Sequence, residues 1–563
     1  MLLHRRPTLV WLIASITLIA LLIRLWGVSF GLPYEYHIDE HFYYPYAWAM
    51  GQGRFNLPDQ SHGPSLYLGL LLIAQQAAHV IVRPDLTSAQ FGKLIVTDPG
   101  LALLAGRLVS ALAGALTVPI VFLLARRYRD ARTGLFAAAI MTVVFFHVRD
   151  SHFGVPDAVM VLFTALTAWL ALRAFDTHRT LDFLLAGFFA GQTAAAKYTS
   201  ALIFVPVILA VIATRRRLLT SGVWLHMAGL GFIVGFVSGY PNILLNFPAF
   251  VKDISFLWIR VGSGFEGWRI VPDDSGWFYL FTLTWSIGLP MMILSAVGLL
   301  EAMARRYAKG WLLISFPVIY FAAMSASRGH FGRYMLPVLP FLAVLTADAG
   351  WRTVPQVLIH LKKRLTDSGR WMQSPFTPRR SSVIFQPASL GIIALLGVIV
   401  PNAVDSLRAD WIMSQPDTRT QAKQWIEANV PAGTRIAIEW PYHTPPLSNG
   451  YEVPPNSQRD YWIDRVWGFG LADRSLEQYQ TDGTQIIVAT SYIRDIPVVD
   501  RAQEDNRQRF YAQLPQVFTE VARFSPRCDG AEPGFIFDQI YGPAIDLWQT
   551  CYAGPLISIY QVH

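Results

Sequence analysis

The sequence predicts a polytopic α-helical membrane protein of about eleven spans, followed by a C-terminal α/β domain outside the membrane. Of its 563 residues, 53% are hydrophobic and only 15% are charged, against roughly 25% charged residues in ordinary soluble domains. The apolar residues form long runs separated by short basic clusters, and the composition becomes that of a soluble domain after about residue 402. We therefore expect a membrane domain over residues 1–402 and a soluble domain over 403–563.

The apolar runs define the expected spans. They cover residues 9–29, 101–125, 134–147, 158–174, 181–196, 199–213, 224–245, 277–300, 311–325, 333–348 and 384–402. Several are shorter than the roughly 20 residues that a straight helix needs to cross a bilayer. Hydropathy alone would therefore allow some of them to be merged or discarded. The first run has no small-residue cleavage site after it, so we expect a retained span and not a signal peptide.

The basic residues favour counting every run as a span, because short cytoplasmic loops are enriched in Lys and Arg. With the N-terminus inside, the inner clusters are Arg5 and Arg6, the arginines of 126–132, Arg173 and Arg179, Arg215 to Arg217, the cations of 305–309 and those of 362–380. The outer segments are then 30–100, 148–157, Lys197, 246–276, 326–332 and the chain after 402. This sidedness accounts for the net charge of +8, so nucleic acid is not expected as a partner.

The long first outer loop, about residues 30–100, contains an apolar stretch of its own. Residues 65–82 are apolar along one helical face and are interrupted by Gln75, Gln76 and His79. We expect a helix lying in the membrane interface. The alternative, a twelfth span, would place the charges of the next loop on the wrong side.

The C-terminal segment alternates helix-like and strand-like patterns. Helices are expected at Thr418–Asn429 and near Ala502–Leu514, and strands at Arg435–Trp440, Gln485–Thr490, Val517–Phe524 and Leu556–Val562, which together indicate a small α/β domain. Cys528 and Cys551 are the only cysteines. They can pair if this domain is extracytoplasmic, or remain as two thiols, because spacing does not determine their geometry.

The first group of candidate functional residues follows the first span. Asp39 and Glu40 lie in YEYHIDEHFYYPYAW, flanked by His37 and His41. Carboxylates in a surface loop can simply be solvated. Here the surrounding aromatic residues would lower the local dielectric and keep a carboxylate basic enough to accept a proton from a hydroxyl group.

A second acidic group lies in the next outer loop, VRDSHFGVPDAV, which contains Asp150, His152 and Asp157. Asp157 follows a proline and precedes an apolar span, so it can either face a polar cavity or stabilise the start of that helix. Asp150 and His152 have no such structural explanation. Together with the first loop they could bind a metal ion, although scattered acids and histidines are a weak ligand signature.

The third group consists of cations on the same side: Lys197, Arg328 and Arg333, with His330 between the two arginines. Ionisable residues at membrane depth usually face a cavity or pair with an anion, and the alternative for each is to extend to the membrane surface. Arg24 and Arg107 lie inside spans, where extension to the surface is the expectation. Arg and Lys both bind phosphate, so a lipid that carries phosphate would suit this group.

These motifs resemble the GT-C superfamily, specifically the protein O-mannosyltransferase-like group that includes the aminoarabinose transferases. Asp39 and Glu40 match its acidic pair in a D-E-x-x-Y-Y setting, and Arg333 and Tyr334 in GRYMLPVLP match an Arg-Tyr element of a late span. His62 in HGPSLY corresponds to a His-Pro-Pro-Leu-like element, from which Gly63 departs. AGRLVSALAGALTVPIVFLLARRY and GFFAGQTAAAKYTS are similar to two further segments of the family, the second of which contains Lys197.

The resemblance implies a hexosyl- or pentosyltransferase that takes sugar from a polyprenyl-phosphate carrier and transfers it, with inversion, to an extracytoplasmic acceptor such as a protein hydroxyl, a lipid or a glycan. Asp39 and Glu40 are the expected catalytic residues. Those expected to bind substrate or carrier phosphate are His62, Asp150, His152, Asp157, Lys197, Arg328, Arg333 and Tyr334. A divalent cation is an open possibility, with Asp39, Glu40, His62 and Asp150 as its candidate ligands. The expected location is a bacterial plasma membrane, with the site and the C-terminal domain outside.

The main alternative from another class is a membrane transporter or flippase for a lipid-linked or anionic substrate, because charges within a membrane also mark transport paths. A transporter predicts charges near mid-bilayer and repeated halves. In this sequence the charges collect at one predicted surface, and no internal repeat is visible.

Overall fold

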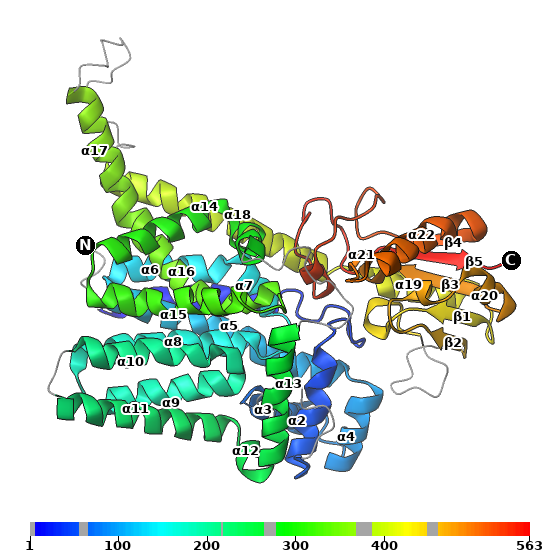
Figure 1. Cartoon of the computed structure of the whole chain (residues 1–563), viewed down its shortest axis with the longest axis horizontal. Helices are drawn as coiled ribbons and strands as arrows, with labels where there is room; N and C mark the ends of the chain where they lie inside the picture. The colour runs from blue at the N-terminus through cyan, green and yellow to red at the C-terminus, as the bar shows by residue number, and fades with distance from the viewer. Residues whose placement is uncertain (1–5, 56–65, 215–217, 264–276, 368–385, 448–459) are drawn as a thin grey trace.

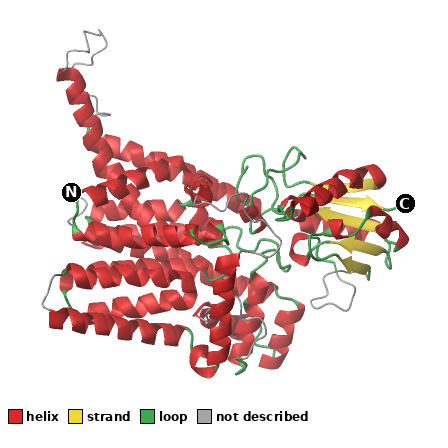
Figure 2. Ribbon diagram, viewed as in Figure 1, coloured by secondary structure: helices red, strands yellow, loops and turns green. Residues whose placement is uncertain are grey.

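The computed structural model consists of a body of membrane helices with a small α/β domain at one end (Figures 1 and 2). The residues it describes are 6–55, 66–214, 218–263, 277–367, 386–447 and 460–563. His62 therefore lies outside the described residues.

Eight helices in these ranges are long and apolar enough to cross a membrane, so the chain is an integral, multi-pass membrane protein. They are α1 (Arg6–Leu25), α5 (Gly100–Tyr128), α8 (Asp157–Thr177), α11 (Leu218–Gly239), α14 (Trp277–Ala304), α15 (Ala308–Ser325), the continuous run Gly332–Leu361, and α18 (Pro387–Met413). The run comprises η5 (Gly332–Val338), α16 (Leu339–Asp348), η6 (Ala349–Thr353) and the first part of α17 (Val354–Asp367).

The predicted count of about eleven spans is not confirmed, because three of the expected spans form helices shorter than 18 residues. They are α6 (Ala131–Val143), α9 (Thr180–Ala196), and η4 (Tyr198–Ile203) continued by α10 (Phe204–Ala213). Nevertheless, α8, α9, α10, α11 and α15 run side by side through the body (Figure 1). Apolar length alone therefore counts fewer crossings than the predicted topology requires.

Closely spaced glycines hold α9 against α11. A Cβ atom at Gly187 would lie 1.9 Å from Ala228 O, and one at Gly235 would lie 2.0 Å from Phe188 O. Only glycine allows the two backbones to approach this closely, as in the small-residue contacts common between membrane helices. The contact fixes α9, at whose end Lys197 lies.

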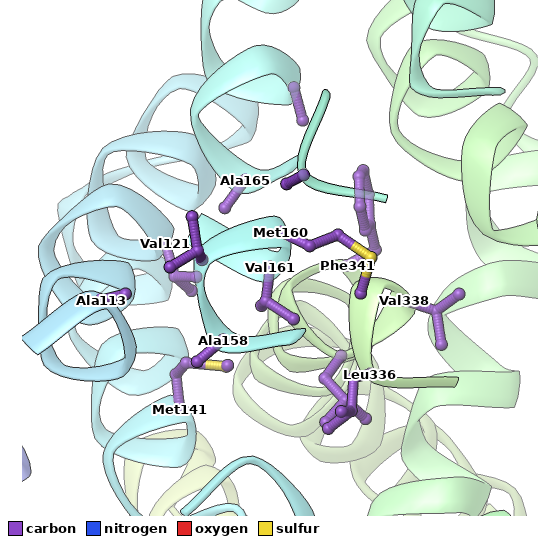
Figure 3. Close-up of a cluster of buried hydrophobic side chains, with 14 of the residues drawn as sticks. Ala113, Val121, Met141, Ala158, Met160, Val161, Ala165, Leu336, Val338 and Phe341 are labelled. Atoms are coloured by element: carbon purple, nitrogen blue, oxygen red, sulfur yellow. The ribbon is translucent and has the colours of Figure 1, made fainter. Parts of the chain in front are cut away.

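The core beneath the candidate site is formed by α5, α6, α8, η5 and α16. Met141, Met160, Leu336 and Phe341, from four of these elements, interdigitate in a fully buried cluster (Figure 3). The same elements present functional side chains, since α8 begins at Asp157 and η5 contains residue 333. Close packing therefore fixes the bases from which those side chains project.

Shorter helices lie in or next to the segments that were predicted to be outside: η2 (Glu40–Phe42), α2 (Tyr44–Gly51), α3 (Leu66–Val82), α4 (Ser88–Thr97), α7 (Phe145–Asp150), α12 (Asn242–Leu245) and α13 (Phe247–Ser263). α3 coincides with the apolar stretch of the first outer loop, packing against α2 and α5. Its placement in the membrane interface remains a prediction.

The C-terminal domain is built on a five-stranded sheet of order β2-β1-β3-β5-β4. Its strands are β1 (Arg435–Ile438), β2 (Trp462–Arg465), β3 (Ile486–Thr490), β4 (Thr519–Phe524) and β5 (Ile557–Gln561). β2, β1 and β3 are parallel, whereas β5 is antiparallel to both β3 and β4. The prediction located every strand except β2, which has only four residues and too little pattern to recognise.

Helices α19 (Thr418–Asn429), α20 (Leu476–Thr481), α21 (Ser491–Asp495) and α22 (Arg501–Val517) accompany the sheet. α18 continues unbroken past residue 402 to Met413, so a rigid helix joins the membrane body to this domain. Of the two alternatives for the cysteines, the structure has Cys528 and Cys551 joined in a disulfide, with their Cα atoms 5.0 Å apart.

Candidate functional site

Asp39 and Arg333 form an ion pair that joins the first outer loop to the start of the Gly332–Leu361 run. Asp39 immediately precedes η2, and Arg333 lies within η5. Their side chains retain 12% and 16% exposure. We call this the accessible pair, because a ligand can still reach both charges.

A second ion pair lies beside it. Lys197 Nζ is 2.8 Å from Asp157 Oδ1, and the Lys197 side chain is 20% exposed. Lys197 Nζ also lies 4.9 Å from the centre of the Tyr334 ring. Burial lowers the pKa of Lys197, and the charge of Arg333 acts in the same direction, whereas the carboxylates of Asp157 and Asp39 act to raise it. Two cations and two carboxylates therefore meet in one place, which we call the charged site.

Asp157 belongs to the charged site through its side chain. It is the first residue of α8, which makes no side-chain cap hydrogen bond at its preceding residue, Pro156. The negative charge still suits the positive end of the helix dipole. The structure thus pairs Asp157 with Lys197, and the two alternatives raised for it, facing a polar cavity and stabilising the helix start, both stay predictions.

Glu40 has a different partner from Asp39 and forms what we call the sealed pair with Arg107 of α5. Arg107 Nε and Nη2 donate to the two carboxylate oxygens at 2.8 Å each, and Gly154 N–H donates to Glu40 Oε1 at 2.7 Å. Both side chains are at most 1% exposed. Burial alone raises the pKa of Glu40, but Arg107 lowers it below its ordinary value. Glu40 therefore connects the first predicted outer loop, to which it belongs, with the second, which contains Gly154.

The expectation that Arg24 and Arg107 extend to the membrane surface is wrong, since both are fully buried. Arg107 also donates to Phe30 O at 2.7 Å. Arg24 donates to Ala20 O at 2.9 Å and contacts His147 Nδ1 at 2.8 Å. Hydrogen bonds to nearby carbonyl and side-chain acceptors replace those that each guanidinium would otherwise make to water.

The second outer loop splits between two places. Asp150 is buried 3.3 Å from Arg149, and burial raises its pKa to about 7 despite the charge of that arginine. His152 turns the other way, with Nε2 2.9 Å from Trp26 O and 3.4 Å from Asp410 Oδ1. His152 thus links α1 to α18 and does not join the charged site.

Arg328 is exposed, and no ion pair connects it to any residue that the structure describes. It does not enter the charged site. In the same ranges, no group of three or more His, Cys, Asp or Glu residues is arranged to hold a metal ion. Because His62 is outside these ranges, the suggested metal ligands remain a prediction.

The sequence analysis missed three residues that border the charged site: Arg149, Asp538 and Tyr541. Arg149 donates to Asp538 O at 2.6 Å, and Gly332 N–H donates to Asp538 Oδ2 at 3.1 Å. The guanidinium of Arg333 lies 4.5 Å from the centre of the Tyr541 ring. Arg149 was detectable as a cation next to Asp150 in an outer loop. The other two lie in η10 (Phe537–Ile540) and just after it, where no sequence pattern marks them.

Comparison with known sequences agrees with the predicted resemblance. The profile of the family described as dolichyl-phosphate-mannose-protein mannosyltransferase matches residues 93–250. A curated relative, the undecaprenyl phosphate-alpha-4-amino-4-deoxy-L-arabinose arabinosyl transferase of Pseudomonas paraeruginosa, is 27% identical over 257 residues. That alignment covers 43% of this chain and 45% of the relative, so the chain spans under half of the length of the curated relative it matches.

Solved structures show the same fold over nearly the whole chain. ArnT of Cupriavidus metallidurans in its apo state matches with a TM-score of 0.53 at 15% identity, covering 98% of this chain and 97% of ArnT. The oligosaccharyltransferase of Archaeoglobus fulgidus matches with a TM-score of 0.52 at 13% identity, covering 87% of this chain and 70% of that protein. These structures show the fold, and the family profile and the curated relative agree with the predicted resemblance to aminoarabinose-transferase-like members of the GT-C superfamily.

Proposed function

We propose that this protein is a membrane glycosyltransferase that moves a sugar from a polyprenyl-phosphate carrier to an acceptor on the extracytoplasmic side, with inversion at the anomeric carbon. The observation that carries the proposal is the charged site itself. Two cations suited to a phosphate lie next to a carboxylate suited to a hydroxyl group, and all of them remain partly accessible.

Carrier binding would begin with exchange of ion-pair partners. Lys197 offers a point charge and Arg333 a planar fork of donors, both of which match phosphate oxygens. In the structure these cations are held by Asp157 and Asp39. A phosphate between them would compete for both, freeing the carboxylate of Asp39. The ion pair would thus keep Asp39 ionised until the donor arrives.

Transfer is then a single displacement at the anomeric carbon. The acceptor oxygen forms a bond to the anomeric carbon while the bond from that carbon to the carrier phosphate oxygen breaks. The acceptor proton passes to Asp39, and the carrier departs with one additional negative charge. Lys197 and Arg333 stabilise that charge as it develops, which is commonly the largest catalytic contribution of such sites. Asp39 acts as the general base.

The neighbouring acids have supporting roles. Glu40 fixes the loop that carries Asp39, because Arg107 and Gly154 occupy its carboxylate. Asp150 is buried beside Arg149 and would help to position the sugar. Should a divalent cation take part, Asp39, His62 and Asp150 are the residues that would hold it.

We place the site and the C-terminal domain outside a bacterial plasma membrane. The positive-inside pattern of the loops supports this orientation. The disulfide of Cys528 and Cys551 agrees with it, because such bonds persist in oxidising compartments. A lipid carrier also suits this side, since its tail can deliver the sugar across the bilayer.

The C-terminal domain would help to select the acceptor, whether protein hydroxyl, lipid or glycan. Tyr541 and Asp538 border the charged site. The ring of Tyr442 also stacks on His41 of the first outer loop, with centroids 4.3 Å apart. The domain thus covers the loop that holds the proposed base.

Purified protein supplied with defined polyprenyl-phosphate sugars and a panel of acceptors tests the proposal, with and without a chelator. Labelled product in the wild type and none in Asp39→Asn supports it. Asp85→Asn is the matched control, because it breaks an exposed ion pair in the same outer loop. Movement of intact lipid-linked sugar across vesicles without any transfer would instead indicate a flippase.

A further inference from the structure

A groove of about 600 Å³ lies between α2 and α4, in the first outer loop but apart from the charged site. Trp48 and Ile95 are buried in its wall, while Val96 is 42% exposed. Arg54 and Lys93 line it with exposed side chains. The groove thus combines an apolar wall with two cations.

Neither cation has a carboxylate partner among the residues that the structure describes. The backbone carbonyl of Lys93 accepts a hydrogen bond from Thr97 Oγ1 at 3.2 Å, a contact that does not involve its ammonium group. The indole N–H of Trp48 also lacks an acceptor in the described ranges, although this side chain is only 5% exposed. Two positive charges that line one groove suit an oxygen-rich anion such as a phosphate.

The exposed apolar surface next to the groove indicates that the anion belongs to a membrane lipid. Trp48 packs near His79 of α3, and α3 ends in the exposed apolar residues Val80, Ile81 and Val82. In a membrane protein, an apolar surface of this kind next to basic residues is typical of contact with lipid at the bilayer surface. A free phosphate would leave the apolar wall and Val96 uncovered.

We propose that this groove binds the headgroup of an anionic membrane phospholipid, with the phosphate between Arg54 and Lys93 and the glycerol and first acyl carbons against Trp48 and Val96. The proposal does not depend on sugar transfer, because it concerns lipid binding alone. A lipid bound there would anchor the loop that carries Asp39 at the membrane surface, because α2, which lines the groove, starts two residues after η2 (Glu40–Phe42) ends.

Native mass spectrometry of the full-length protein in detergent, with added phosphatidylglycerol or phosphatidylcholine, tests the proposal. R54Q/K93Q should retain phosphatidylglycerol roughly 30-fold more weakly, from the usual contribution of each cation near an anionic lipid. R501Q/R509Q is the control, since it removes two exposed arginines from α22 of the C-terminal domain. It should bind both lipids as the wild type does.

A second variant probes the apolar half of the groove without changing charge. Ala89 is exposed and lines the groove, so A89F should fill it and weaken retention of both lipids. All of these side chains are exposed, and the melting temperatures should stay at the wild-type value. Equal phosphatidylglycerol retention by R54Q/K93Q and R501Q/R509Q would overturn the proposal. So would displacement of the lipid by inorganic phosphate at equal concentration, because the ligand would then be a free anion.

Discussion

Asp39 and Glu40 are adjacent in the chain, yet their carboxylates belong to two different kinds of ion pair. The sealed pair of Glu40 and Arg107 is at most 1% exposed, and every oxygen of the carboxylate is occupied. The accessible pair of Asp39 and Arg333 keeps 12% and 16% exposure. The same residue types thus form a structural ion pair where water is excluded and, in the proposed mechanism, a reactive one where a ligand can enter.

The largest expected effect comes from removing the charge of the accessible pair. Asp39→Asn should lower kcat by about 10²- to 10⁴-fold, the usual contribution of a general base, while the melting temperature changes little. Transfer kinetics and thermal unfolding in detergent measure the two quantities. A normal kcat in this variant would show that Asp39 is not the general base.

Breaking the sealed pair should instead affect stability. Arg107→Met leaves a buried carboxylate without its cation, so the free energy of unfolding should fall by about 3–5 kcal/mol. The double variant Glu40→Gln/Arg107→Met should recover much of that loss, because neither charge then remains buried. Equilibrium unfolding in mixed micelles distinguishes them. If the double variant were as unstable as the single one, the pair would not be the cause.

A smaller effect separates the charge of Arg333 from its shape. Arg333→Lys keeps the positive charge but loses the planar fork, so kcat/KM for the carrier-linked sugar should fall about tenfold. Arg328→Gln is the matched control, since this exposed arginine lies outside the charged site and its loss should leave the rate unchanged. Equal losses in both variants would argue that only the overall positive charge of the segment matters.

The smallest effect concerns Glu439 of the C-terminal domain. This buried carboxylate forms no ion pair with any residue that the structure describes. It accepts hydrogen bonds from Thr490 N–H at 2.9 Å and from Tyr511, and burial raises its pKa to about 7. Between the ordinary Glu pKa and 7 the folded domain binds more protons than the unfolded chain. Its free energy of unfolding should therefore decrease as the pH rises through this window, by at most about 1.4 kcal/mol per pH unit.

Hydrogen exchange of β1 and β3 in the intact protein measures this slope. Glu439→Gln should remove it, because the amide does not titrate. If the free energy of unfolding of the variant still decreased with pH in this window, the pH dependence would come from another buried group and not from Glu439.

Much of the fold followed from local patterns. Apolar runs located the membrane helices, and alternating polarity located four of the strands, because burial in lipid or against a sheet face imposes a period on the sequence. The helix expected at Thr418–Asn429 is α19. The short helices α6 and α9 were correctly located. Whether each of them crosses the membrane depends on the helices packed around it, which hydropathy does not describe.

What the sequence determined by itself was the kind of site: acids and cations on one predicted face, with motifs that resemble carrier-dependent transferases. Only the tertiary structure decided which charges meet. Arg107 reaches Glu40 across 67 residues and Arg333 reaches Asp39 across 294, whereas His152 and Arg328 lie elsewhere. The physical reason is that helical and strand periodicity is a local property of the chain, while the pairing and burial of a charge depend on which distant segments the packed core brings beside it.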